Sequence, residues 1–228
     1  MPADESSHQV PAAQALAHFL NKHLPTGCIG AVRPIHPDDE RCLTESEARG
    51  LDRAVASVRR ASGAGRDLAR MLCGQLGVPV REIPRTAERY PLWPQGIVGS
   101  ITHDREFAAA VVAPSDRLRG IGIDIEPAEP LQPGICNIVS PPGEMAAFSD
   151  IRFGDKALFS IKEAVFKTVY PRDGRFLDFH EVAVTRHTRT ARTNYGRVVH
   201  WRVTTLPRVL AIAWCSEEED ASRSDPAR

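Results

Sequence analysis

Two acidic residues stand two positions apart in the segment Gly120-Ile-Gly-Ile-Asp-Ile-Glu126. Side chains alternate between faces along a strand, so Asp124 and Glu126 should point the same way, opposite three isoleucines that enter a core. The glycines on the carboxylate face should leave empty space there. Two like charges this close repel unless one binds a proton or a cation lies between them. The pattern fits either a solvated acidic strand or a site for Mg²⁺ or Mn²⁺.

A third carboxylate lies in the apolar segment 159–170, Phe-Ser-Ile-Lys-Glu-Ala-Val-Phe-Lys-Thr-Val-Tyr. A segment that is apolar on nearly every side predicts a buried helix. Glu163 and Lys167 are four residues apart and share a face of that helix. Charges in such a setting need partners or a metal. One interpretation is a structural Glu–Lys pair; the other is that Glu163 completes a metal site with Asp124 and Glu126, while Lys167 contacts a phosphate.

Arginines are concentrated in the segment 59–85. They fit a solvated helix face, or a phosphate site, because guanidinium groups match phosphate oxygens in a bidentate way. No Walker sequence and no Gly-x-Gly-x-x-Gly helix start is present, so the usual nucleotide-binding loops are excluded. The segment 99–104 should place Thr102 and His103 at a strand end. The arginines concerned are Arg59, Arg60, Arg66, Arg70 and Arg85.

The elements expected around these residues mix helix and strand. Helices are predicted over 12–23, after a capping box at Thr44 and Glu47, over 66–76 following an interruption at Gly63 and Gly65, and over 155–170, ending before Pro171. Proline-rich loops are predicted over 81–97 and 127–142. Strands are predicted over 96–101, 107–113, 119–125, 179–185, 198–204 and 209–214.

Composition narrows the class of protein. The chain has 228 residues, enough for one large domain or two small halves with a buried core. Lys+Arg and Asp+Glu are equal at 29 each, which argues against a general nucleic-acid or membrane-surface binder. No apolar run could span a bilayer and the first residues are polar, so neither a membrane segment nor a signal peptide is expected. Five widely spaced cysteines favour the reducing cytoplasm over disulfides or zinc.

Four motifs occur in a fixed order: Trp93-Pro94, Gly-Ser-Ile-Thr-His (99–103), Gly-Ile-Asp-Ile-Glu (122–126) and Phe-Ser-Ile-Lys-Glu-Ala-Val-Phe-Lys (159–167). Together they resemble the 4′-phosphopantetheinyl transferases of the Sfp and EntD type, most closely the EntD-like bacterial branch. The resemblance implies an α+β fold of two similar α/β halves packed about a pseudo-twofold axis. It also implies Mg²⁺-dependent transfer of phosphopantetheine from coenzyme A to a carrier-protein serine, releasing adenosine 3′,5′-bisphosphate.

The resemblance also implies roles for individual residues. Asp124, Glu126 and Glu163 match the metal ligands, and Glu163 is also the candidate general base. Lys167 matches the lysine on the coenzyme A phosphates, and His103 the histidine on the 3′-phosphate, with Thr102 beside it. Basic residues that match contacts to coenzyme A are Arg59 or Arg60, Arg66 and Arg85.

The expected partners are carrier domains of fatty-acid, polyketide or nonribosomal peptide synthases, including siderophore synthases of the enterobactin type. The enzyme is expected to be a monomer that contacts the carrier through loop 127–142. Two alternatives stay open: a Mg²⁺-dependent phosphohydrolase or nuclease built on the same carboxylates, and a non-catalytic coenzyme A-binding module. The expected organisation is a flexible 1–10, an N-terminal half with the basic residues over 11–115, a C-terminal half with the metal site over 116–215, and a flexible tail 216–228.

Overall fold

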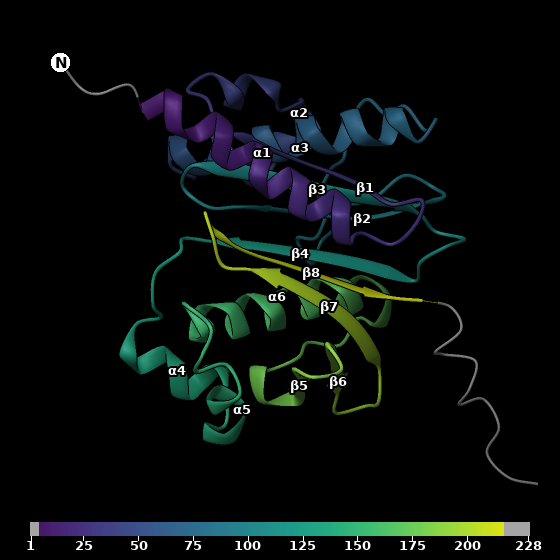
Figure 1. The fold of residues 1–228 in the computed structure, drawn as a ribbon. Coiled ribbons are helices and arrows are strands. Elements are labelled where there is room, and N and C mark those ends of the chain that lie inside the picture. The colour runs from purple at the N-terminus through teal and green to yellow at the C-terminus, as the bar shows by residue number, and fades with distance from the viewer. Residues whose placement is uncertain (1–4, 217–228) are drawn as a thin grey trace, which may run out of the picture. The chain divides into compact units, whose positions relative to one another are not determined.

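The computed structural model describes residues 5–216, which divide after Pro114 into two compact units. Each unit contains helices and one antiparallel sheet, so the expected α+β class is confirmed. The sheet of the first unit has three strands in the order β1-β3-β2. The sheet of the second has five, in the order β4-β8-β7-β6-β5 (Figure 1).

The first unit places its central strand, β3, under helix α3. Residues 107–113 of β3 are all buried, which is typical of a strand covered on both faces. The Thr44–Glu47 capping box is present and begins the short helix α2. The elements are α1 (Glu5–His23), β1 (Ile29–Pro34), η1 (Asp39–Cys42), α2 (Glu45–Ala48), α3 (Ala56–Gln75), β2 (Ile97–His103) and β3 (Phe107–Pro114).

The beginning of the chain differs from the prediction. Helix α1 begins at Glu5, so residues 5–10, expected to be flexible, are helical. Its apolar residues at 13, 16 and 20 are buried at helical spacing. Strand β1 was not predicted. Its Gly30 is held against α1 by Asn21, whose side chain accepts a hydrogen bond from the Gly30 N–H at 3.3 Å and donates one to the Gly30 carbonyl oxygen at 3.0 Å.

Helix α3 runs through Gly63 and Gly65, where an interruption was predicted. The glycines are needed for close approach. A Cβ atom on Gly63 would lie 1.9 Å from the carbonyl oxygen of Asp39, and one on Gly65 would lie 2.5 Å from Ile101. Because both sit against neighbouring segments, packing of the whole helix outweighs their low helix propensity. The helix ends where expected, with Gly77 at a φ of 78° just beyond it.

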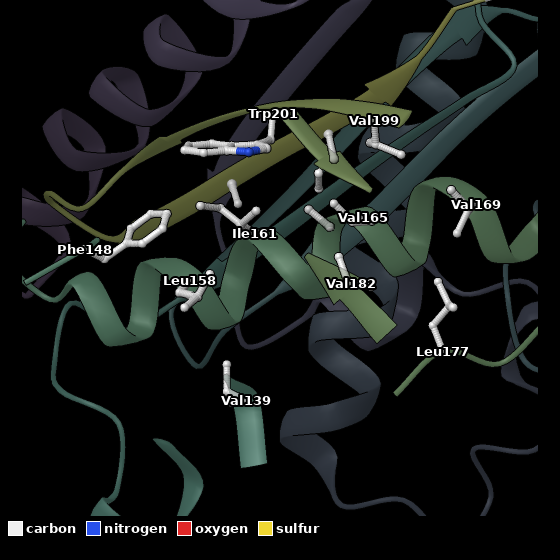
Figure 2. Packing of buried hydrophobic residues seen from close by; sticks show 14 of the residues in the cluster. Val139, Phe148, Leu158, Ile161, Val165, Val169, Leu177, Val182, Val199 and Trp201 are labelled. Carbon is white, nitrogen blue, oxygen red and sulfur yellow. The ribbon is translucent and has the colours of Figure 1, made fainter. Parts of the chain in front are cut away.

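The second unit is built around helix α6, which covers the sheet formed by β4, β8 and β7. Figure 2 shows Ile161 and Val165 of α6 among the side chains of the core, with Trp201 and Val199 of β7 above them. The elements are β4 (Gly120–Glu126), α4 (Pro133–Val139), α5 (Pro142–Ala146), α6 (Gly154–Asp173), η2 (Phe179–Glu181), β5 (Val182–Thr185), β6 (Thr190–Thr193), β7 (Val198–Thr204) and β8 (Val209–Cys215).

Prolines misled the prediction in this unit. The segment 127–142 is not one irregular loop, because α4 starts at Pro133 and α5 at Pro142. Proline suits the first position of a helix, where its missing N–H would have no helical partner. Helix α6 also continues past Pro171 and ends at Gly174, whose φ is 63°.

Three details complete the second unit. The predicted strand 179–185 opens with the 3₁₀ turn η2, and β6 was not predicted. In the predicted tail, residues 217–228 lie outside the described part. Among residues 5–216, no helix is long and apolar enough to cross a membrane.

Candidate active site

The acidic motif of β4 faces helix α6 at very short range. Ile121, Ile123 and Ile125 are buried on the opposite face, as predicted. The glycines leave no empty space, and that expectation was wrong. A Cβ on Gly120 would lie 2.2 Å from the carbonyl oxygen of Thr168, and one on Gly122 would lie 2.1 Å from that of Ala164. The glycines therefore bring the helix backbone against the strand.

The spacing of residues along β4 matches the spacing of residues along α6 at this β4–α6 interface. Two residues of a strand advance about 6.7 Å and four residues of a helix about 6 Å, so every second residue of β4 meets every fourth residue of α6. The pairs run in opposite directions along the chain. They are Gly120 with Thr168, Gly122 with Ala164, Asp124 with Ser160, and Glu126 with Lys156.

Asp124 lies at the centre of the polar part of this interface. Its side chain is 7% exposed, and one oxygen accepts a hydrogen bond from the Ser160 hydroxyl at 2.9 Å. The other oxygen accepts from the Lys167 ammonium at 2.7 Å, and Lys167 also donates to the carbonyl oxygen of Ile123 at 3.2 Å. A buried carboxylate and a half-buried lysine are thus held together in one geometry.

The other two carboxylates respond to the same negative charge. Burial and the charge of Asp124 raise the pKa of Glu126, although Lys156 opposes the shift from 3.3 Å away. Burial and Asp124 also raise the pKa of Glu163, Lys167 lowers it, and Glu126 raises it further. The predicted trio therefore shares one electrostatic neighbourhood, contributed by β4 and α6.

The donor types of this trio suit a hard cation. Carboxylate oxygens are the ligands that Mg²⁺ and Mn²⁺ prefer, and a cation would relieve the mutual repulsion of the three groups. Within residues 5–216, however, no three His, Cys, Asp or Glu side chains are gathered closely enough to hold a metal ion. Lys167 forms an ion pair with Asp124, and Lys156 forms one with Glu126. The side chain of Glu163 has no hydrogen bond or ion pair among the described residues.

The first unit supplies a basic group around helix α3. Arg66 is 3% exposed; its Nε donates to the carbonyl oxygen of Ile83 at 3.1 Å and its Nη1 to that of Ser62 at 3.4 Å. Arg85 donates to the Ser62 hydroxyl at 2.9 Å. Burial and the positive charge of Arg85 lower the pKa of Arg66 to about 10. Positive charge is therefore buried here beyond what neighbouring acids neutralise, which favours an anion.

The remaining predicted arginines differ in their partners. Arg59 donates to Glu40 at 3.1 Å and to the carbonyl oxygen of Ala54, so this guanidinium is engaged with unit 1 itself. Arg60 has a buried Nε with no hydrogen-bond partner in the described part of the chain. Of the two alternatives that the resemblance left open, Arg60 is the one with a buried donor that lacks a hydrogen-bond partner among the described residues. Arg70 is structural, bound to Glu47 through contacts of 2.6 and 2.7 Å.

The strand-end residues lie where expected on β2. Thr102 is 5% exposed and His103, the last residue of the strand, is exposed. The register pairs them with Ala109 and Ala108 of β3.

Sequence reasoning missed several supporting residues. Lys156 and Ser160, which bind Glu126 and Asp124, belong to the predicted helix 155–170 but were not singled out. Their signal is the four-residue spacing that runs from 156 through 160 to 164. Lys162, the other lysine of the motif 159–167, is 2% exposed and binds a different part of the second unit.

The comparisons with known proteins agree with this arrangement of two units. Residues 46–113 match the family model of the 4′-phosphopantetheinyl transferase N-terminal domain, and residues 120–223 match that of the 4′-phosphopantetheinyl transferase superfamily. The first match covers α3 with its arginines, and the second covers the β4–α6 interface.

Three curated relatives are similar over much of their length. The 4′-phosphopantetheinyl transferase Npt of Nocardia iowensis is 34% identical over 165 residues, covering 71% of this chain and 74% of Npt. The transferase PptT of Mycobacterium tuberculosis is 36% identical over 62% of this chain and 64% of PptT. The transferase Svp of Streptomyces mobaraensis is 39% identical over 64% of this chain and 62% of Svp.

The fold and the matches define a transferase of the two-unit α+β type. The chain belongs to the 4′-phosphopantetheinyl transferase superfamily, as the four motifs predicted.

Proposed function

We propose that this enzyme moves phosphopantetheine from coenzyme A to a serine hydroxyl of an apo acyl or peptidyl carrier protein in a Mg²⁺-dependent reaction. The observation that carries the proposal is the β4–α6 interface, where Asp124, Glu126 and Glu163 share one charge environment and Lys167 is held at 2.7 Å from Asp124. The other product is adenosine 3′,5′-bisphosphate.

Asp124, Glu126 and Glu163 are the residues that would hold the metal. When bound, Mg²⁺ would supply positive charge to the diphosphate of coenzyme A, and Mn²⁺ offers the same chemistry. For Asp124 and Glu126 to serve as ligands, Lys167 and Lys156 must release carboxylate oxygens. Both lysines then become available to phosphate oxygens.

The basic residues stabilise the charge that develops on the leaving phosphate. Phosphoryl-type transfer depends mainly on positioning and on fixed positive charge, rather than on covalent chemistry by the protein. Lys167 supplies such charge from α6. Arg60, Arg66 and Arg85 hold coenzyme A phosphates, Arg59 adds to this group once it leaves Glu40, and His103, with Thr102 beside it, contacts the 3′-phosphate.

Glu163 is the base that accepts the serine proton. In the metal-free protein, burial and the charge of Asp124 raise the pKa of Glu163, the direction that favours a proton acceptor. As the proton moves to Glu163, the serine oxygen bonds to the phosphorus that carries pantetheine. The bond from that phosphorus to the bridging oxygen breaks, and adenosine 3′,5′-bisphosphate leaves.

The carrier meets the segment that contains α4 and α5. Ile138 of α4 is 58% exposed, an apolar side chain available to a protein partner. Carriers of fatty-acid, polyketide or nonribosomal peptide synthases, including siderophore synthases of the enterobactin type, are the proposed class. The enzyme is proposed to act as a monomer in the cytoplasm.

One experiment tests the function against its rivals. The protein is incubated with coenzyme A, Mg²⁺ and several apo carriers, and each carrier is weighed by mass spectrometry. A gain of one phosphopantetheine supports transfer. Metal-dependent cleavage of coenzyme A with no gain on any carrier would favour the phosphohydrolase, and binding without chemistry would favour the coenzyme A-binding module.

A further inference from the structure

A second lysine of helix α6 connects the helix to the segment formed by α4 and α5. Lys162 is 2% exposed, and its ammonium uses all three N–H donors. It donates to Glu144 Oε2 at 2.6 Å, to the carbonyl oxygen of Val139 at 2.9 Å and to that of Phe179 at 2.9 Å. One ammonium therefore ties the end of α4, the middle of α5 and the turn η2 to the helix that carries Glu163.

The partner carboxylate is equally well occupied. Glu144 Oε1 accepts the backbone N–H of Val184 at 2.5 Å, and Oε2 accepts the Ser140 hydroxyl at 2.6 Å. A buried ion pair whose hydrogen bonds are all made specifies one arrangement of the surrounding segments. In this case the segments are α4, α5, β5 and α6.

Apolar packing between these helices is incomplete beside the ion pair. A cavity of about 480 Å³ lies between α4, α5 and the start of α6, lined in part by Cys136, Met145, Phe148 and Asp155. Ser140 lines the same cavity and also donates to Glu144. Val139 is part of the apolar core, with Ile135 and Cys136 packed against it, and the polar link adds directional contacts to that packing.

The Lys162–Glu144 pair is connected to the exposed surface of α4 through two neighbouring residues, Val139 and Ile138. Val139 is fully buried, and its carbonyl oxygen accepts from Lys162, whereas its neighbour Ile138 is 58% exposed. Figure 2 shows Val139 reaching toward α6 below Leu158, on the other side of the helix from Trp201. Lys162 therefore fixes the face of α4 that presents Ile138.

We infer that Lys162 and Glu144 form a positioning pair that orients the α4–α5 surface for the carrier protein, without contacting coenzyme A or the reacting atoms. This inference rests on the proposed function. It separates the two lysines of the helix motif: Lys167 acts on phosphate charge at the β4–α6 interface, and Lys162 acts on carrier recognition at the other side of α6.

The test measures carrier transfer with the full chain while carrier and coenzyme A are varied separately. In Lys162→Met we expect the KM for carrier to rise about tenfold, equivalent to about 1.4 kcal/mol, and the KM for coenzyme A to stay within about twofold. Glu144→Gln serves as the second variant if Lys162→Met does not fold. The matched control is Asp173→Asn, which breaks the Asp173–Arg197 pair at the other end of α6, where the contacts are 2.7 and 3.0 Å.

A second readout reports on the position of α4 directly. Alkylation of Cys136 by iodoacetamide, followed on its own peptide by mass spectrometry, should be faster in Lys162→Met and unchanged in Asp173→Asn. The double variant Lys162→Met with Glu144→Leu removes both charges; it should regain stability but not the low KM for carrier.

Three results would contradict the inference. An unchanged Cys136 rate in Lys162→Met would overturn the positioning role, and so would equal rises in both KM values. Recovery of the carrier KM in the double variant would show that packing suffices. No mass gain on any carrier with the unaltered protein would instead overturn the proposed function.

Discussion

Helix α3 in the first unit and helix α6 in the second each run for 20 residues beside an antiparallel sheet, and each comes close to its neighbours at a pair of glycines two residues apart. In α3 the glycines belong to the helix, at 63 and 65. In the second unit they belong to the strand, at 120 and 122. Glycine therefore allows a helix and its neighbour to approach closely, whichever of the two carries it. In neither unit does the glycine pair interrupt an element or leave an empty space.

The charges at these two contacts differ in sign and in how they are neutralised. At the β4–α6 interface, lysines 156 and 167 lie on carboxylates of the strand. Around α3, burial and the charge of Arg85 lower the pKa of Arg66, burial and the charge of Arg89 lower the pKa of Arg85, and no carboxylate pairs with Arg85 within residues 5–216. The β4–α6 interface fits a site where a metal and phosphate groups replace the internal ion pairs. The arginines around α3 fit a site that binds an anion.

Substitution of the closely packed glycines should have the largest effect, a loss of stability. Gly122→Ala should lower the free energy of unfolding by about 3 kcal/mol, because its Cβ would meet backbone atoms of α6 at 2.1 Å. Gly63→Ala should behave alike in the first unit. Denaturant unfolding measures both.

Gly74→Ala is the matched control for these variants. It lies on α3 with no atom within 4 Å of its Cβ position, and it should gain about 0.5–1 kcal/mol from helix propensity. If Gly122→Ala were as stable as the unaltered protein, the close approach of α6 to β4 would be wrong.

Lys167→Ala should have the next largest effect. Removing fixed positive charge from the leaving phosphate should lower kcat/KM about 100-fold, with losses in both the rate and the affinity for coenzyme A. Steady-state transfer and calorimetric binding of coenzyme A measure the two parts. A change confined to the KM for carrier would show that Lys167 acts like Lys162, and the distinction between the two lysines would fail.

Arg85→Gln should act on binding more than on chemistry. Loss of a charge-assisted contact to phosphate should raise the KM for coenzyme A about tenfold while kcat changes little. This split would sharpen the contrast between the units, because substitutions of the carboxylates at the β4–α6 interface should act mainly on kcat. An unchanged KM would remove Arg85 from the phosphate site.

His103→Ala should have the smallest effect. His103 is exposed at the end of β2, so its contact with phosphate is screened by solvent and should contribute only about threefold to the KM for coenzyme A. Coenzyme A lacking the 3′-phosphate offers a direct comparison. The variant and the unaltered protein should have the same KM for that substrate, and a persisting difference would contradict the 3′-phosphate role.

The sequence could predict what local pattern determines. The capping box at Thr44, the strands that became β2, β3 and β4, and the buried helix α6 each follow from spacing within one segment. Strands β1 and β6 were missed because neither sequence alternates clearly between apolar and polar residues, although Ala191 and Thr193 of the four-residue β6 are buried.

The glycine and proline errors share a cause, since both residues were interpreted by their average behaviour. Gly63 and Gly122 are decided by atoms of distant segments, Asp39 and Ala164, which no local window contains. Pro133 begins a helix, because its position at the first turn removes the usual cost of a missing N–H.

The candidate site shows what a single sequence does and does not reveal about side-chain partners. Asp124, Glu126 and Glu163 were identified from type and spacing, supported by the resemblance to the family. Their partners Lys156 and Ser160 were not, because those contacts depend on how strand and helix align across 30 and 36 residues of chain.

The central claim is that the carboxylates of the β4–α6 interface perform the metal-dependent chemistry, while the arginines of the first unit bind coenzyme A. Its most direct test is Asp124→Asn, measured for coenzyme A binding and for carrier transfer across a Mg²⁺ titration. We expect transfer to be abolished at every Mg²⁺ concentration, with metal-free coenzyme A affinity within about threefold of the unaltered protein. Near-normal transfer at saturating Mg²⁺ would contradict the claim.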